Sequence, residues 1–247
     1  MAPTNVPGLL FVYAEPGSRV TDTEFDAWVD EHVPRRMAIS GFQHTTVWTA
    51  ADGKTPSRLG AYDVTSSAVF ADEAYTSLAR TLSDHEKDVM SRLAAGDRRI
   101  YDALPSPIDA EPLPPAPAHD VHAPGPFLLI LEIQVPAELE EDFNKWYTEE
   151  HIPLLSKVPG WRRSRRFILR EAGPAKAAST ATENASSLPP KFLTLHEWES
   201  PAGFESEAMV KARNTPWATR IKESADTWEV RLFKAGKSWA GTGESSS

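Results

Sequence analysis

The chain of 247 residues contains no cysteine. This absence excludes a disulfide framework, a thiolate nucleophile and any metal site with a cysteine ligand, and it is typical of a reducing compartment. No apolar run is long enough to cross a bilayer, and the first residues show no basic segment followed by an apolar one. We therefore expect a cytoplasmic protein without a membrane partner. The net charge of −9 and the isoelectric point of about 5.3 also disfavour a nucleic-acid partner.

The sequence patterns that hold common cofactors are missing as well. There is no glycine-rich phosphate loop, no nucleophile elbow and no HExxH helix. His196, Glu197 and Glu199 are metal-ligand types, but their positions along one strand do not converge on a single ion. The sequence therefore predicts a site with no metal and no cofactor.

Tryptophan, by contrast, is abundant, with eight residues in the chain. Indoles often line apolar ligand pockets, although they also serve to fill cores. We expect four of them to shape or support a substrate pocket: Trp28, Trp146, Trp161 and Trp198.

One unusual phrase occurs twice. Residues 24–34 read EFDAWVDEHVP, and residues 142–153 read DFNKWYTEEHIP. The offset is 118 at the phenylalanine (143 − 25) and 119 at the histidine (151 − 32), so the second copy carries one extra residue between Trp and His. Upstream and downstream segments continue the match. A repeat of this length indicates a whole small domain that is used twice.

Each half predicts elements in the order β-α-β-β-α-β, the split βαβ pattern. In the first half a helix is expected from about residue 22, Pro34 disfavours its continuation, and a second helical stretch is expected over 67–95. Strands are expected there at 8–14, 42–49, 58–64 and 98–104. In the second half, helical segments are expected at 137–157 and 203–225, and strands at 127–135, 161–170, 191–199 and 227–233.

The chain therefore divides into a first repeat at 1–104, a Pro-rich linker at 105–126, a second repeat at 127–235 and a flexible tail at 236–247. The linker contains eight prolines, which favour an extended, semi-rigid connector. Residues 171–190, rich in Ala, Ser, Thr and Pro, are long for a hairpin loop and are expected to be disordered or to form a lid.

A split βαβ domain covers one face of its antiparallel sheet with two helices and leaves the other face bare. Val47, Leu128 and Ile130 make this face too apolar to remain in water. We therefore expect an α+β protein in which the sheets of two tandem ferredoxin-like βαββαβ repeats pack together or close into one barrel. Because the second sheet is on the same chain, the expected state is a monomer that forms an intramolecular pseudo-dimer. The sequence does not decide whether two such monomers associate into a homodimer.

The phrases WYTEEHIPLL (146–155) and PGW (159–161) resemble the W-Y-x-x-E-H-x-P-L … P-G-aromatic pattern of the EthD-like branch of the dimeric α/β-barrel superfamily. The first copy departs from this pattern, since residues 28–34 are one residue shorter and Ile39-Ser40-Gly41 replaces Val-Pro-Gly. The fused arrangement is similar to fungal members associated with secondary metabolism. The resemblance implies a fold and a pocket more than one reaction, because members of the superfamily include polyketide cyclases, lactone isomerases, cofactor-free quinol-type monooxygenases and, further away, haem enzymes.

In isomerase-like members the motif histidine takes part in proton transfer at the pocket, and the resemblance assigns this role to His151 and, less directly, to His32. An imidazole titrates near neutral pH, so it serves as acid or base. The alternative for both is a histidine that bonds a free carbonyl at its helix end. On the strand 191–199, alternation places His196 on one face with Thr194 and Trp198.

The first copy has Tyr62 at the position of His196, so the two sites are expected to differ there. Glu132 interrupts an apolar strand, where burial would raise its pKa towards that of a general base, unless the strand end already reaches water. Arg163 and Arg165 share one face of a strand and could receive a substrate carboxylate or enolate, or could form a solvated, salt-bridged face.

The sequence as a whole predicts a cofactor-independent enzyme of secondary metabolism that acts on a small hydrophobic, polyketide- or terpenoid-like molecule. The expected reaction is proton transfer, as in a cyclase, isomerase or dehydratase. His151 would be the general acid and base, with His196, Glu132 or His32 as further catalytic candidates. The alternatives are a quinol-type monooxygenase, a non-catalytic binding or stress protein and, least favoured, a haem protein.

Overall fold

The computed structural model describes residues 6–105, 124–174 and 188–241. The chain splits into two compact units. The first unit comprises Met1–Ala103, Leu169–Pro189 and Gly236–Ser247, and the second comprises Leu104–Ile168 and Pro190–Ala235. Most of the predicted linker (106–123) and of the predicted loop at 171–190 (175–187) lie outside the described residues.

The predicted α+β class is confirmed, with two halves that each follow the ferredoxin-like order. The strands are β1 (Gly8–Glu15), β2 (Phe42–Ala50), β3 (Arg58–Val64), β4 (Ala95–Leu104), β5 (Phe127–Gln134), β6 (Trp161–Pro174), β7 (Phe192–Trp198) and β8 (Thr227–Ala240). The hydrogen-bonded order is that of a closed antiparallel barrel, β1-β3-β2-β8-β5-β7-β6-β4.

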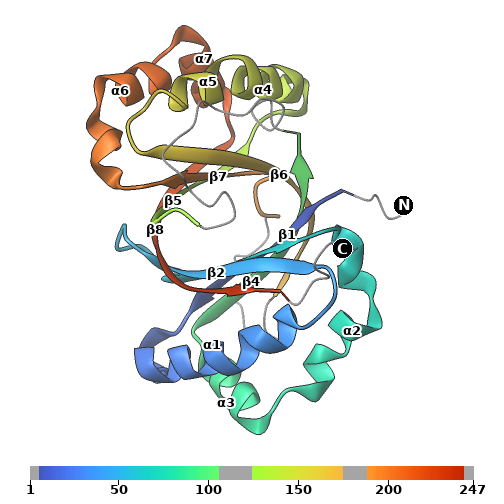
Figure 1. Ribbon diagram of the computed structural model, residues 1–247. Helices are drawn as coiled ribbons and strands as arrows, with labels where there is room; N and C mark the ends of the chain where they lie inside the picture. The colour runs from blue at the N-terminus through green and yellow to red at the C-terminus, as the bar shows by residue number, and fades with distance from the viewer. Residues whose placement is uncertain (1–5, 106–123, 175–187, 242–247) are drawn as a thin grey trace, which may run out of the picture. The chain divides into compact units, whose positions relative to one another are not determined.

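Helices cover one face of the strands in the first unit (Figure 1). They are α1 (Asp22–Met37), α2 (Glu73–Thr76) and α3 (Asp84–Arg92), with short 3-10 turns η1 (Gly17–Arg19), η2 (Ser67–Ala71) and η3 (Leu78–Thr81). Thr21 and Glu24 form a capping box at the start of α1. The helix then buries Phe25, Trp28 and Val29 against the sheet, as their spacing predicts.

The prediction that Pro34 ends the regular helix is wrong. Helix α1 continues through Pro34 to Met37. Proline removes one backbone donor from a helix, which disfavours its use in the interior. Here the residues on both sides, Val33 and Met37, are buried in the same core, and this packing holds the last turn in place.

The second unit repeats the arrangement with its own helices (Figure 1). They are α4 (Glu140–Trp146), the π-helical segment η5 (Tyr147–His151), α5 (Ile152–Leu155), α6 (Glu207–Arg213) and α7 (Pro216–Ser224), with 3-10 turns η4 (Ala137–Leu139) and η6 (Pro201–Glu205). Serine and threonine side chains cap α6 and α7, since Ser206 accepts from the backbone of Met209 and Thr215 from that of Ala218.

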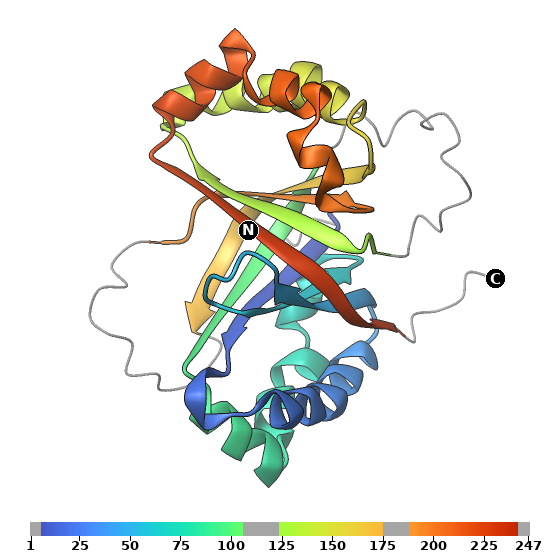
Figure 2. The ribbon, with the colours of Figure 1, turned by 90° about the vertical axis from the view of Figure 1, so that its left-hand side faces the viewer.

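Strand β8 is longer than predicted and takes up the first residues of the expected tail (Figure 2). Its end, which belongs to the first unit, is held by Ser238 Oγ, 2.9 Å from Thr46 Oγ. The strand can pass close to the backbone of Val47 because residue 236 is a glycine. A β-carbon there would lie 2.7 Å from the carbonyl oxygen of Val47, so only glycine permits this approach. Sequence patterning missed the extension because the segment alternates weakly.

Candidate active site

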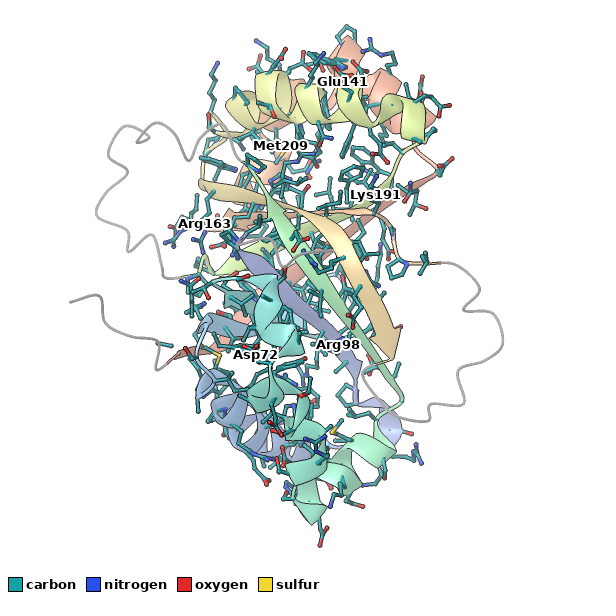
Figure 3. All side chains as sticks on the ribbon, turned by 90° about the vertical axis from the view of Figure 1, so that its right-hand side faces the viewer. Asp72, Arg98, Glu141, Arg163, Lys191 and Met209 are labelled. Carbon is teal, nitrogen blue, oxygen red and sulfur yellow. The ribbon has the colours of Figure 1, made fainter. Side chains whose placement is uncertain are left out.

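Each unit contains a pocket between its sheet and its helices. The pocket of the second unit has a volume of about 460 Å³, and that of the first unit about 260 Å³. The second pocket is lined by His151, His196, Trp146, Trp198, Leu129, Leu131, Leu155, Phe204, Met209, Arg213 and others from α4 to α7 and β8. Figure 3 labels Met209, which is buried on α6. Such apolar walls with a few polar groups are typical of small-molecule sites.

The extra residue of the second copy is absorbed by a change of helix type. In the first unit Trp28 and His32 are four residues apart on α1, and their rings stack with centroids 4.9 Å apart. In the second unit Trp146 and His151 are five residues apart across η5, and they stack at 4.3 Å. A π-helical turn adds one residue without rotating the following helix off its face, and such turns are frequent at functional sites.

His151 presents one nitrogen as a hydrogen-bond acceptor. Its Nδ1–H donates to the carbonyl oxygen of Ala212 at 3.3 Å, which leaves the lone pair on Nε2. Among the described residues Nε2 has no hydrogen-bond partner. Burial lowers the pKa of His151 to about 4, and the positive charge of Arg166 acts in the same direction. The ring is therefore neutral at pH 7 and able to accept a proton.

His196 lies on β7 and is anchored through its other nitrogen. Its Nδ1 is 2.6 Å from Ser164 Oγ, and the same oxygen accepts from Trp161 Nε1 at 3.0 Å. Its Nε2 is fully buried and has no hydrogen-bond partner among the residues that the structure describes. Burial moves the pKa of His196 well below its usual value, and His151 and Arg166 add to the shift. When Ser164 donates to Nδ1, the proton of the neutral ring is on Nε2.

The two imidazoles form the polar centre of the second pocket. Their centroids are 6.1 Å apart and their planes are nearly perpendicular. Tyr147 packs against both rings, at 5.2 Å from His151 and 6.4 Å from His196, and Arg166 stacks over Tyr147 at 4.3 Å. The arrangement combines a hydrogen-bond acceptor, a second polar nitrogen and a fixed positive charge in a dry environment, which suits stabilisation of a developing oxyanion.

The first unit organises its motif histidine differently. His32 Nδ1–H donates to Glu86 Oε1 at 2.7 Å, and Arg36 donates to His32 Nε2 at 3.0 Å. Both ring nitrogens are therefore occupied. Burial lowers the pKa of His32 to about 4, and Arg36 supports this shift while Glu86 opposes it. Tyr62 lines the same pocket, as does Trp28.

Several residues that the sequence singled out lie away from the second pocket. Leu129 and Leu131 line it from β5, so Glu132 is on the opposite face of that strand, where it is buried. Arg163, labelled in Figure 3, and Arg165 form ion pairs with Glu197 at 2.8 and 3.4 Å. Neighbouring residues of a strand point to opposite faces, so Glu197 and its two arginine partners lie on the face opposite His196. Trp161 supports the site through Ser164.

Sequence reasoning did not single out Ser164, Ala212, Arg36 and Glu86. Ser164 lies opposite His196 in the pairing of β6 with β7, so strand pairing could have indicated the contact. A bulge between Trp161 and Arg163 shifts the register of this pair, and the sequence does not show the shift. Arg36 is four residues from His32 and so shares its helix face. Glu86 lies in the second helical region of the first half, and Ala212 in that of the second half. No local sequence pattern predicts that either residue contacts its histidine.

No protein-family model matches the chain, and no curated protein is similar to it. Solved structures are similar over nearly the whole chain. An anthrone oxidase-like protein has a TM-score of 0.62 at 12% identity, covering 97% of this chain and 94% of its own. The fold is that of the dimeric α/β barrel.

Two further solved structures are similar to this chain in fold. A candidate monooxygenase from Fusobacterium nucleatum subsp. nucleatum has a TM-score of 0.54 at 10% identity and covers 98% of this chain and 97% of its own. A chlorite dismutase variant from Candidatus Nitrospira defluvii reaches 0.56 at 10% identity, covering 96% and 93%.

The described residues contain no group of three or more His, Asp or Glu residues placed to hold a metal ion. Within the same residues no helix is both long and apolar enough to cross a membrane.

Proposed function

We propose that the second-unit pocket catalyses proton transfer within a small hydrophobic, oxygenated molecule of the polyketide or terpenoid type, as a cyclase, isomerase or dehydratase of secondary metabolism. The observation that carries the proposal is the pair of neutral imidazoles in one apolar pocket, each anchored through Nδ1. This assignment also follows the EthD-like resemblance of the motif around His151.

In the proposed step, Nε2 of His151 takes a proton from a carbon beside a carbonyl group of the substrate. Nε2–H of His196 donates a hydrogen bond to the carbonyl oxygen, on which negative charge develops as the enolate forms. The His151 imidazolium then returns the proton to a different carbon, which completes an isomerisation, or to a leaving oxygen, which completes a dehydration. Arg166, stacked on Tyr147, stabilises the negative charge at longer range.

The low pKa of His151 restricts the substrate. A base with a pKa of about 4 holds a proton weakly, and each unit of pKa difference from the carbon acid adds about 1.4 kcal/mol to the free energy of the proton transfer. The substrate must therefore carry an acidified C–H, flanked by two carbonyl groups or by a carbonyl and aromatic rings. Trp146 and Trp198, which line the pocket, favour a flat aromatic body.

The second candidate is a cofactor-free quinol-type monooxygenase. Solved structures described as an anthrone oxidase-like protein and as a monooxygenase share the fold, and that reaction also begins with removal of a proton from the substrate. The deprotonated substrate then reduces dioxygen itself. For anthrone the balance is one anthrone and one O₂ giving one anthraquinone and one water.

Anthrone tests both candidates in one assay, because its C10 hydrogens are acidified by a carbonyl and two rings. Under nitrogen in deuterated buffer, the protein should accelerate exchange of these hydrogens, measured by NMR against a protein-free control. In air, an oxygen electrode then shows whether O₂ is consumed.

Exchange without O₂ consumption supports the isomerase-like activity, and stoichiometric O₂ consumption supports the monooxygenase. Saturable quenching of tryptophan fluorescence with neither reaction would identify a non-catalytic binding protein and would contradict both. A visible absorption band of the purified protein near the haem Soret position would point to a haem protein instead.

A further inference from the structure

The pocket of the first unit has a charge pattern that the proposed reaction does not use. Its lining contains three arginines, Arg36, Arg58 and Arg98, and no aspartate or glutamate. The rest of the lining is largely apolar and aromatic, including Phe25, Trp28, Tyr62, Tyr75, Val29 and Leu59. The chain as a whole has a net charge of −9, so three cations around one apolar pocket are unexpected.

Two of these arginines are neutralised by partners outside the lining. Arg58 pairs with Asp22 at 2.5 Å. Arg98, labelled on β4 in Figure 3, pairs with Glu171 at 2.8 Å and donates to Tyr75 Oη at 3.0 Å. Their guanidinium groups therefore carry no uncompensated charge into the pocket.

Arg36 differs from the other two. Within the described part of the chain it forms no ion pair, and its polar contacts there are a hydrogen bond to His32 Nε2 at 3.0 Å and stacking over Tyr62 at 4.9 Å. Its Nε is buried without a hydrogen-bond partner. A half-buried guanidinium with unused donors in an apolar pocket is costly unless an anion joins it.

Glu86, the carboxylate that bonds to His32, does not supply this anion. Glu86 is fully buried and pairs with Arg35, and it also accepts from His32 Nδ1 and from the backbone N–H of Ser83. The negative charge of Glu86 is thus balanced by Arg35. His32 is neutral between Glu86 and Arg36, so one positive charge remains at the pocket.

We infer that the first-unit pocket is a second ligand site, which binds a small molecule with a flat aromatic body and a single carboxylate. The carboxylate pairs with the free donors of Arg36, and the body packs between Trp28, Tyr75 and Leu78. His32 acts as a positioning residue that directs Arg36.

The second unit has no counterpart of Arg36, and the two cations that line its pocket, Arg213 and Lys222, come from α6 and α7 instead. The 119-residue offset of the repeat places Leu155 at the position of Arg36, since 36 + 119 = 155, and Leu155 lines the second pocket. The inference therefore stands independently of the proposed reaction, and the two pockets have different chemistry.

Binding of a matched pair of probes tests the inference. Isothermal titration calorimetry at neutral pH compares 2-naphthoate with the neutral 2-naphthylmethanol, on the full chain and on Arg36→Gln, Arg36→Lys and the control Arg80→Gln. Arg80 is exposed, pairs with Glu73 and does not line the pocket. Thermal denaturation establishes that each variant is folded.

The wild type should prefer naphthoate by about tenfold or more, R36Q should lose this preference, R36K should keep part of it, and R80Q should match the wild type. Equal binding of both probes, no saturable naphthoate binding, or an unchanged preference in R36Q would overturn the inference. A wild-type crystal soaked in naphthoate gives a second readout that needs no variant. A carboxylate beside Arg36 supports the site, and naphthoate seated only at His151 contradicts it.

Discussion

At the scale of single residues, burial keeps three histidines of the molecule neutral. His32, His151 and His196 all have pKa values lowered by desolvation, and none is paired so as to favour its charged form overall. A neutral imidazole with one anchored nitrogen keeps a defined tautomer, and the other nitrogen then has a fixed role as donor or acceptor. This is why the contact of Nδ1 decides what each histidine can do.

The lowered pKa of His151 predicts a loss of stability in acid. In the unfolded chain a histidine takes up a proton near its reference pKa of 6.5, whereas the folded chain resists until about pH 4. The unfolded state therefore binds more protons in this window, and stability falls as pH decreases through it. At about pH 5 the loss from His151 is about 2 kcal/mol relative to neutral pH.

Urea denaturation of the wild type and of His151→Gln, at neutral pH and at about pH 5, measures this difference. H151Q should lose less stability on acidification than the wild type by about that amount. Equal acid sensitivity of the two proteins would show that His151 is already protonated or exposed in the folded state.

The proposed activity, like the stability, should decrease as the pH is lowered. The base form of His151 is present above its pKa of about 4, so the rate should be constant through neutral pH and should fall as the pH approaches this value. A rate profile measured by anthrone exchange checks this. A midpoint near the ordinary histidine value of 6.5 would contradict a desolvated base.

At the scale of elements, close backbone approach sets the limits of strand β8. Gly236→Ala places a β-carbon 2.7 Å from the Val47 carbonyl oxygen, and we expect it to destabilise the protein by about 1–3 kcal/mol. Gly173→Ala is the matched control, because no atom of the described residues lies within 4 Å of a β-carbon at this position, and its expected effect is within about 0.5 kcal/mol. The denaturant midpoints of the two variants measure this difference in stability. Equal midpoints would contradict the close approach of Gly236 to the Val47 carbonyl oxygen.

The elements also show what the sequence could predict. Apolar alternation and the repeat predicted the βαββαβ order and most strand limits, because each sheet has one face against its helices. The π-helical segment was visible only as a one-residue offset between the copies, and its hydrogen-bonding type depends on the packing of Trp146 and His151. Glu132 could not be assigned to a pocket, since alternation gives the face of a strand but not what covers it.

At the scale of the whole molecule, one architecture appears twice with different chemistry. The first unit has His32, Arg36 and Tyr62 where the second has His151, Leu155 and His196. Of the residues that the structure describes, none lines both pockets. A change confined to one unit should therefore leave the chemistry of the other unit intact.

Glu86→Gln tests this independence. Glu86 joins His32, Arg35 and the N-cap Ser83 in the first unit, so removing its charge should lower the free energy of unfolding by about 2 kcal/mol. Anthrone exchange in the second unit should stay within about twofold of the wild type, well below the effect of losing a general base. A large loss of exchange in folded E86Q would show that the two sites are coupled.

Proton transfer by His151 is measured by comparing anthrone exchange in His151→Gln and in the wild type. The matched control is His85→Gln, since His85 is half-exposed and pairs with Glu31 on the surface. With both variants folded, H151Q should lose about 100-fold or more of the protein-dependent exchange and H85Q should retain it. Full exchange by H151Q would contradict the account.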